Sequence, residues 1–319
     1  MKVLVTGANG FVGAAATAQL AQSGYQTMAL SRHRLAPSSL GAHITPICGT
    51  FEDLAQWQQA LAGCDAVVHS AARVHQVQEA ASDPLKDYRR VNVDHTLALA
   101  RAAHNQGVKR FVFLSSIKVN GEQTAAAQPF LADDVCNPLD PYGISKYEAE
   151  QALLQLAMET GLEVVIIRPP LVYGPGVKAN FLSMMRWLHR GLPLPLGAIH
   201  NQRSLLGLGN LLDLINVCLT HPMAANQIFL ASDGHDVSTT ELLQRMAKAL
   251  NASPRLVKVP QSWLEASAKL VGKPGMAQRL CGNLAVDISK TRDLLGWHSP
   301  VSLEAGLRDT AAHFLQSRA

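Results

Sequence analysis

The sequence predicts an α/β fold in which a doubly wound parallel sheet is followed by a smaller C-terminal domain. Short apolar runs rich in β-branched residues alternate with helix-forming segments as far as Arg168, and such runs are typical of parallel strands buried on both faces. Beyond Pro169, prolines and glycines interrupt short helices and strands. We therefore predict a first domain over residues 1–168 and a second mainly over residues 169–319, with some of its segments returning to the sheet.

Six strands are expected, each a short apolar run bounded by polar or turn-forming residues. They are Val3–Val5, Gln26–Leu30, Ile44–Cys48, Ala66–His69, Arg110–Ser115 and Glu163–Arg168. The expected helices between them are Ala14–Ala21, Asp53–Leu61, Pro84–Asn105 and one that starts near Tyr142. Gly24 suits the position just after the first helix, and Pro84 suits the first turn of the third. Asp140 is the expected N-cap of the fourth helix, with Pro141 as its first residue.

Three glycines mark the turn from the first strand into the first helix. Gly7, Gly10 and Gly13 follow one another at three-residue spacing, and the first N–H groups of a helix have no partner within it. Glycines allow this backbone to approach a pyrophosphate closely, and the last one allows the helix to pack tightly on the strand. Although the spacing is GxxGxxG rather than GxGxxG, its place after the first strand favours a dinucleotide site over an ordinary turn.

Composition and charge argue against several classes of function. Hydrophobic residues make up 48% of the chain and charged residues 16%, which fits a globular protein with a large core. The net charge of +4 comes without a run of lysines and arginines, so no binding to nucleic acid is expected. No apolar stretch reaches the roughly 18 residues of a membrane helix. Because the N-terminus reads as a strand rather than a signal peptide, we expect no membrane insertion.

Cysteines and histidines give no signature of a disulfide framework or a metal site. The five cysteines are scattered without a CxxC pair, which predicts reduced thiols and a cytoplasmic protein. The twelve histidines contain no HExxH motif, so no metal is expected.

A tyrosine and a lysine one helical turn apart form the candidate catalytic pair. Tyr142 and Lys146 share one face of the expected helix, because residues four apart are neighbours on a helix. A tyrosine with a pKa of about 10 is a poor acid or base at neutral pH, and a neighbouring ammonium lowers that pKa towards the working range. Ser116, at the end of the fifth strand, can hydrogen-bond the same substrate oxygen. We predict Ser116, Tyr142 and Lys146 as the catalytic residues.

Seven motifs along essentially the whole chain carry a resemblance to a known family. They are TGANGFVG at Thr6–Gly13, HSAA at His69–Ala72, VNVDHT at Val91–Thr96, SSIKVNG at Ser115–Gly121, YGISK at Tyr142–Lys146, RPPLVYGPG at Arg168–Gly176 and DISKTRDLLGW at Asp287–Trp297. The chain resembles the extended short-chain dehydrogenase/reductases, in particular the nucleotide-sugar epimerase/dehydratase group. Within that group it is most similar to bacterial enzymes of surface-polysaccharide sugar synthesis.

The resemblance implies a Rossmann-type dinucleotide-binding domain and roles for individual residues. Tyr142 would be the acid/base, Lys146 would lower its pKa and hold the nicotinamide ribose, and Ser116 would orient the reacting oxygen. The cofactor-binding residues predicted from the turn, the strand ends and the family are Gly7, Asn9, Gly10, Phe11, Val12, Gly13, Ser31, Arg32, Ser70, Ala71, Ala72, Asn92, Ser115, Tyr142, Lys146 and Pro169. The family also implies a homodimer formed through the helices near Pro84–Asn105 and Tyr142–Thr160.

The residues after the second strand favour NADP(H) as the cofactor, with NAD(H) also permitted. NAD-specific relatives carry an acid there, whereas this chain has Ser31–Arg34, which reads SRHR. An arginine suits a 2′-phosphate; if Arg32 instead stacks on the adenine, either cofactor is permitted. Many relatives also carry an aspartate after the glycine that ends the third strand. Here Gly49 is followed by Thr50 and Phe51, so an adenine contact is expected to be lost.

The substrate side is predicted from residues that suit a nucleotide sugar. Guanidinium groups match a diphosphate through bidentate contacts, which makes Arg203 and Arg279 candidates, although each could equally be a solvated surface arginine. The predicted substrate-binding residues are Arg73, Ser116, Lys118, Tyr142, Asn180, Phe181, Arg203 and Arg279. The long loop Glu122–Asp140 is expected to act as a lid.

The two residues that follow Ser116 distinguish the reactions that members of the family perform. Dehydratases of the family use an Asp–Glu pair there, whereas this chain has Ile117 and Lys118, so dehydration is not expected. We predict an NAD(P)-dependent oxidoreductase acting at C4 of a UDP-linked hexose. The main interpretation is a 4-keto reductase of the UDP-N-acetylquinovosamine type, in O-antigen or other surface-polysaccharide synthesis. Arg32 favours the reductase, because it indicates NADP(H). A net reductase must exchange its spent cofactor, whereas an enzyme that retains its cofactor does best with tightly bound NAD.

Three alternatives stay open at this point. A UDP-hexose 4-epimerase, acting on UDP-glucose or UDP-N-acetylglucosamine, needs the same residues but retains its cofactor through two opposite hydride transfers. A non-catalytic dinucleotide-sensing scaffold would be expected to lose the tyrosine–lysine pair. A ketone reductase for steroid-like or flavonoid-like substrates would not need arginines for a diphosphate.

Overall fold

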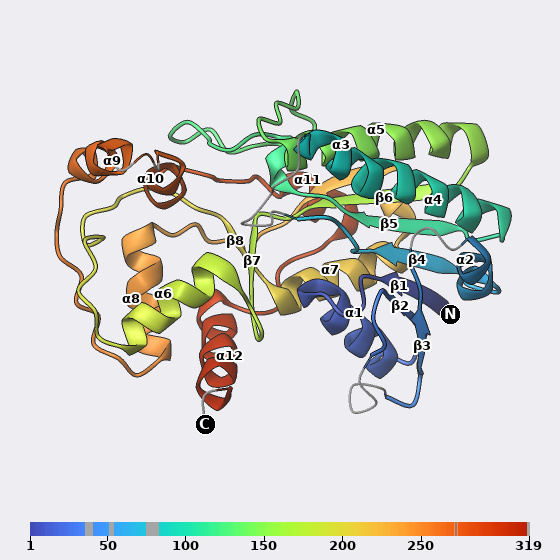
Figure 1. Cartoon of the computed structure of the whole chain (residues 1–319), viewed down its shortest axis with the longest axis horizontal. Helices are drawn as coiled ribbons and strands as arrows, with labels where there is room; N and C mark the ends of the chain where they lie inside the picture. The colour runs from blue at the N-terminus through green and yellow to red at the C-terminus, as the bar shows by residue number, and fades with distance from the viewer. Residues whose placement is uncertain (36–40, 51–53, 75–82, 271, 273, 318–319) are drawn as a thin grey trace.

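A parallel sheet of seven strands forms the centre of the computed structural model (Figure 1), which describes residues 1–35, 41–50, 54–74, 83–270, 272 and 274–317. The strands are β1 (Lys2–Thr6), β2 (Gln26–Ser31), β3 (Ile44–Cys48), β4 (Ala66–His69), β5 (Arg110–Leu114), β6 (Glu163–Arg168) and β9 (Gln227–Leu230). Their spatial order is β3-β2-β1-β4-β5-β6-β9. The chain thus winds outwards from β1 in both directions, which confirms the doubly wound parallel sheet.

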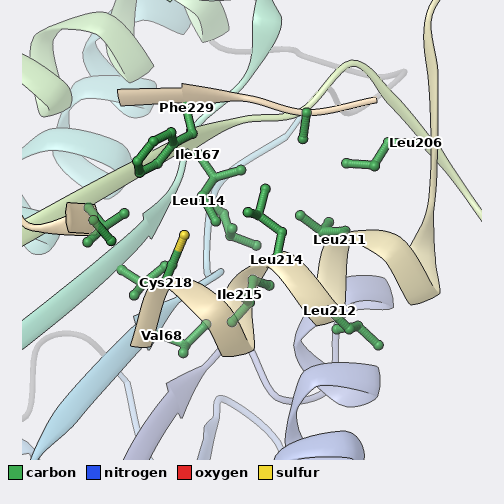
Figure 2. Packing of buried hydrophobic residues seen from close by; sticks show 14 of the residues in the cluster. Val68, Leu114, Ile167, Leu206, Leu211, Leu212, Leu214, Ile215, Cys218 and Phe229 are labelled. Atoms are coloured by element: carbon green, nitrogen blue, oxygen red, sulfur yellow. The ribbon is translucent and has the colours of Figure 1, made fainter. Parts of the chain in front are cut away.

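Helices cover both faces of the sheet (Figure 1). The helices α1 (Phe11–Gln22) and α7 (Leu208–Thr220) pack on one face, and α2 (Leu54–Leu61), α4 (His95–Asn105) and α5 (Pro141–Thr160) pack on the other. Val3 and Val5 face the first layer and Leu4 faces the second, because successive side chains of a strand point to opposite faces. Figure 2 shows the α7 side of the core, where Leu211, Leu214, Ile215 and Cys218 meet Val68, Leu114 and Ile167.

The six expected strands agree with the structure to within one residue at each end. The strand β9 is not among them, although the sequence predicts that some C-terminal segments return to the sheet. The helices differ more. The expected helix over 84–105 consists of α3 (Pro84–Arg89), a π-helical turn at Arg90–Asp94 and α4. Asp53, the expected start of the second helix, lies outside the described residues.

The C-terminal half contributes to the sheet and also forms a core of its own. Its further elements are β7 (Leu171–Tyr173), α6 (Ala179–His189), β8 (Leu205–Gly207), α8 (Thr239–Ala249), α9 (Gln261–Leu270), α10 (Pro274–Cys281), α11 (Ser289–Leu295) and α12 (Leu303–Gln316). The helices α6, α8 and α12 share a separate hydrophobic cluster, whereas β9 and α7 join the sheet. A domain boundary at residue 168 stays a prediction. Of the helices described, none has both the length and the apolar character needed to cross a bilayer.

Candidate active site

The turn between β1 and α1 has the geometry of an anion cradle. Gly7 has a φ of +71°, and a Cβ atom there would lie 2.9 Å from the backbone of Ala71. A Cβ on Gly13 would lie 2.1 Å from the Gly7 carbonyl oxygen, so this glycine allows α1 to pack closely on the strand. Among the described residues no side chain caps α1, and its first turn holds no acid. The exposed N–H groups and the helix dipole therefore fit the pyrophosphate of a dinucleotide.

A buried histidine joins the end of β1 to the end of β4. The two ring nitrogens of His69 lie 2.8 Å from Thr6 Oγ1 and 2.9 Å from Thr96 Oγ1. Burial, with a smaller effect of the Lys146 charge, lowers the pKa of His69 to about 3. Beside it, Ser70 Oγ donates to the Thr6 carbonyl oxygen at 2.6 Å. His69 is thus a neutral structural residue that fixes the two strand ends.

Asn92 lies in the π-helical turn and ties three segments together. Its Oδ1 accepts the Arg73 N–H at 2.8 Å, and its Nδ2 donates to the Arg73 carbonyl oxygen at 3.1 Å and to Ser145 Oγ at 2.9 Å. The side chain is completely buried. Asn92 therefore fixes the loop after β4 against α5, and the π-turn supplies the local geometry, as such turns often do at functional sites.

The three predicted catalytic residues lie together where β5 ends and α5 begins. Asp140 caps α5 by accepting the Gly143 N–H at 2.6 Å, which sets Tyr142 in the first turn. The Tyr142 hydroxyl hydrogen-bonds the Ser116 side chain. Lys146 is buried, and its Nζ donates to the Leu114 carbonyl oxygen at 2.7 Å and lies 4.4 Å from the centre of the Phe113 ring.

The predicted lowering of the Tyr142 pKa is wrong for this arrangement. Burial and the nearby Asp140 charge raise the pKa of Tyr142, and only the hydrogen bond from Ser116 opposes them. Burial also lowers the pKa of Lys146 to about 7, while Glu150 raises it. The Lys146 ammonium turns towards Leu114 and Phe113, and its charge is not among the causes of the Tyr142 pKa shift.

A buried ion pair that the sequence analysis missed lies directly behind these residues. Arg168 contacts both Glu150 oxygens, with the shortest distance 2.6 Å, and both side chains are at most 1% exposed. Glu150 also accepts a hydrogen bond from Ser115, and Arg168 donates to Asn120 Oδ1 at 3.0 Å. Burial alone would lower the pKa of Arg168, yet the hydrogen bond and charge of Glu150 raise it. Glu150 could have been found as a charged residue four positions beyond Lys146 on the same helix face.

The other predicted cofactor-binding residues lie along the same carboxyl edge of the sheet. Asn9 is exposed in the turn, Phe11 and Val12 form the first turn of α1, and Ala71 and Ala72 follow β4. The Pro169 carbonyl oxygen accepts the Ile117 N–H at 3.0 Å. At the end of β2, Ser31 is buried and donates to the His33 carbonyl oxygen at 2.6 Å, whereas Arg32 is exposed. Phe51 lies outside the described residues.

Arg73 is linked to Tyr142 through the side chain of Tyr88. Its guanidinium lies 5.8 Å from the centre of the Tyr88 ring, and the Tyr88 ring meets the Tyr142 ring edge-on at 6.2 Å. Arg73 also pairs with Asp87 at 3.4 Å, yet its buried Nε has no hydrogen-bond partner among the described residues. Arg73 is thus one wall of the site.

Two of the predicted substrate contacts serve the fold instead. Lys118 Nζ pairs with Asp140 and lies 3.3 Å from Glu122, so it holds the α5 cap rather than reaching out towards a sugar. Phe181 is 1% exposed and stacks on Tyr173 at 5.5 Å within the C-terminal core. The prediction that Phe181 lines a substrate pocket is therefore wrong, because its ring points from α6 into the C-terminal core. Asn180, its neighbour, is exposed.

The two candidate arginines have different surroundings. Arg203 is half-buried, and burial lowers its pKa. Its Nη1 donates to the Gly282 carbonyl oxygen at 2.9 Å, and none of the described acids forms an ion pair with it. Arg279 is exposed on α10. The expected lid, Glu122–Asp140, is held by backbone bonds from Thr124 to Asn283 and from Phe130 to Ala285.

Comparison with known proteins gives consistent matches. The model of the NAD-dependent epimerase/dehydratase family matches residues 3–231. A UDP-glucose 4-epimerase of Vibrio cholerae is 45% identical over 317 residues, which cover 99% of this chain and 96% of that protein. Among solved structures, a Thermotoga maritima UDP-glucose 4-epimerase with UDP-glucose superposes with a TM-score of 0.81 at 23% identity, covering both chains completely. MoeE5 in complex with UDP-glucose and NAD superposes with a TM-score of 0.78 at 25% identity, also over both complete chains.

Proposed function

The chain belongs to the NAD-dependent epimerase/dehydratase family, and from this premise we propose that it is a UDP-hexose 4-epimerase. The observation that carries the proposal is the 45% identity to a UDP-glucose 4-epimerase over almost the whole of both chains. The site supports it through an intact serine, tyrosine and lysine, and through Ile117 and Lys118, where a dehydratase would carry two acids. This replaces the 4-keto reductase as the main interpretation.

In the proposed reaction Tyr142 moves the proton of the sugar C4 hydroxyl. Ser116, hydrogen-bonded to Tyr142, would hold the same oxygen and stabilise its developing charge. Lys146, buried next to Leu114 and Phe113, would hold the nicotinamide ribose. The nicotinamide supplies the hydride acceptor and donor when it is bound. Asn92 and Glu150 would keep these groups in place.

The proposed cofactor is NAD(H), held at Gly7, Gly10 and Gly13. Membership of an NAD-dependent family supports NAD(H), and the first turn of α1, where the described chain holds no acid, fits the pyrophosphate of either dinucleotide. Arg32, exposed at the end of β2, supports NADP(H) instead through contact with a 2′-phosphate. Mass spectrometry of the nucleotide that copurifies with the protein distinguishes the two.

Arg32 is also the one observation that favours the 4-keto reductase as a second candidate. An epimerase converts UDP-glucose and UDP-galactose into each other without net consumption of reductant. A reductase consumes one NADPH for each 4-keto sugar that it reduces. Incubation of the purified enzyme with each substrate, with absorbance at 340 nm and chromatography of the sugars, separates the two functions.

The test of the catalytic assignment is Tyr142→Phe, with Tyr147→Phe on the same helix as the matched control. We expect Tyr142→Phe to lose at least about 100-fold in kcat, because general acid–base catalysis contributes that much, and Tyr147→Phe to keep the wild-type rate. Unchanged turnover in Tyr142→Phe would overturn the catalytic assignment. A wild type that binds the dinucleotide but converts no substrate would favour a non-catalytic scaffold, and conversion of lipid ketones but no UDP-sugar would favour a ketone reductase.

We also propose a biological role, a cellular location and an oligomeric state for the protein. A UDP-hexose substrate fits synthesis of surface polysaccharides such as O-antigen, and the unpaired cysteines support a cytoplasmic location. We expect a homodimer through α4 and α5, which light scattering would detect as a mass of about twice 34.3 kDa.

A further inference from the structure

The outer face of α9 is apolar although it faces solvent. Trp263, Ala266, Ser267 and Leu270 occupy positions i, i+3, i+4 and i+7 of this helix and are all exposed. Trp263 is 70% exposed and Leu270 is 89% exposed. The opposite side of the helix packs inwards through Leu264 and the buried Ala268. A surface helix normally presents its polar side to water, so this face is built for contact with something apolar.

The same segment carries the excess positive charge of the protein. Residues 251–281 hold five of the 28 basic residues and one of the 24 acidic residues, which leaves 23 of each sign in the rest of the chain. Arg255, Lys258, Lys269 and Arg279 are exposed, and none of these four pairs with an acid among the described residues. Lys273, the fifth, lies outside those residues. The apolar face thus belongs to a segment whose exposed cations have no acidic partner among the described residues.

The segment lies where a flat surface can reach it. Figure 1 shows α9 and α10 side by side at the end of the molecule opposite β3, and the two helices contact each other. With 10 residues, α9 is too short to cross a bilayer and suits a position parallel to its surface. We call Trp263, Leu270, Lys258, Lys269 and Arg279 the docking face.

We infer that the docking face binds the surface of an anionic phospholipid bilayer. Tryptophan favours the boundary between lipid headgroups and acyl chains, and lysine and arginine are attracted to anionic headgroups. A second copy of this chain fits less well, because a two-fold contact would bring two segments of like charge together. The inference does not depend on the proposed reaction.

The docking face is connected to the candidate site. The end of α10 is held by hydrogen bonds from Asn201 to the Leu280 carbonyl oxygen at 3.2 Å and from Arg203 to the Gly282 carbonyl oxygen at 2.9 Å. Binding through α9 and α10 would thus hold the Arg203 side of the site close to the membrane.

Co-sedimentation of the full chain with vesicles tests the inference. We expect binding to phosphatidylcholine vesicles that contain phosphatidylglycerol, and its loss on pure phosphatidylcholine or at about 0.5 M salt, where charges are screened. Each basic residue near an anionic surface contributes roughly five-fold to binding. The Lys258→Gln/Lys269→Gln variant should therefore bind about 25-fold more weakly, and Trp263→Ser/Leu270→Ser should bind at least about 10-fold more weakly.

The matched control is Lys109→Gln/Met223→Ser, which changes one exposed cation and one exposed methionine outside the docking face. It should bind as the wild type does, and thermal melting shows that each variant is folded. Absence of binding to phosphatidylglycerol vesicles at low salt would overturn the inference, as would equal binding by wild type and both docking-face variants. A change of oligomeric mass in Trp263→Ser/Leu270→Ser without lipid would identify the face as a contact between copies and would also overturn it.

Discussion

Glu150 is the residue on which the shape of the candidate site depends most directly. It stands two helical turns from Tyr142 and one from Lys146 on α5, accepts a hydrogen bond from Ser115 and pairs with Arg168 at the end of β6. Its charge also raises the pKa of Lys146. One buried carboxylate therefore holds two strand ends and α5 together.

We predict that Glu150→Gln is strongly destabilised, because it leaves the Arg168 charge buried without its counter-ion. Breaking one side of such a pair costs about 3–5 kcal/mol, which urea unfolding would measure. Glu148→Gln is the matched control, since Glu148 pairs with Arg89 on the surface of the same helix, where ion pairs contribute little. Equal stability of the two variants would contradict the prediction.

Single residues show where sequence reasoning succeeds and where it stops. Asp140, as the cap of α5, follows from local geometry and is confirmed. Phe181 and Lys118 were predicted from their place after a strand or turn, but the direction of a side chain depends on the packing of distant elements. The Tyr142 pKa depends on burial, which no local pattern contains.

At the scale of elements, His69 joins β1, β4 and α4 through Thr6 and Thr96. Its pKa is about 3 in the folded chain, compared with about 6.5 in an unfolded one. Between these values the unfolded state binds the extra proton, so the free energy of unfolding falls as the pH falls below 6.5. The effect is about 1.4 kcal/mol for each pH unit.

We therefore expect the wild type to lose stability steeply between pH 6.5 and pH 4. The His69→Gln variant should start less stable at pH 7, because it loses ring packing, but should show a slope smaller by up to about 1.4 kcal/mol per pH unit. Urea unfolding at a series of pH values measures both. Parallel curves for wild type and variant would show that His69 is not the titrating group.

The strands were predictable because each one is a buried apolar run that its own residues define. The π-turn at Arg90–Asp94 was not, because one extra residue in a turn leaves the helical pattern on either side unchanged. The strand β9 was missed because it lies in a half of the chain where prolines and glycines break the pattern, and only its pairing with β6 makes it part of the sheet.

At the scale of the whole molecule, the sheet core and the C-terminal core are joined next to the glycine turn. Phe11 packs against both the α7 side of the sheet core and the C-terminal core. Asp233, just after β9, accepts hydrogen bonds from Tyr173 and Asn210, each at 2.7 Å. These contacts could not be predicted from the sequence, because Asp233 lies 60 positions from Tyr173 and 23 positions from Asn210. The halves are expected to hold different parts of the ligands.

The expectation that the two halves bind different parts of the ligands gives a prediction for Arg203. It is half-buried and belongs to the C-terminal half, far along the chain from the glycine turn. If it binds the diphosphate of a UDP-sugar, Arg203→Gln should raise KM about 10- to 100-fold, because a hydrogen bond to a charged group contributes roughly 1.5–3 kcal/mol. The amount of copurified NAD should not change, since the dinucleotide is held by the other half.

Arg279→Gln is the comparison variant, because Arg279 is the second predicted diphosphate ligand but is exposed on α10. Steady-state kinetics and the nucleotide content of both variants should be compared without vesicles, so that membrane binding does not contribute. A similar rise of KM in both variants would mean that the two arginines share the diphosphate. Loss of NAD from Arg203→Gln would mean that the halves do not bind their ligands separately.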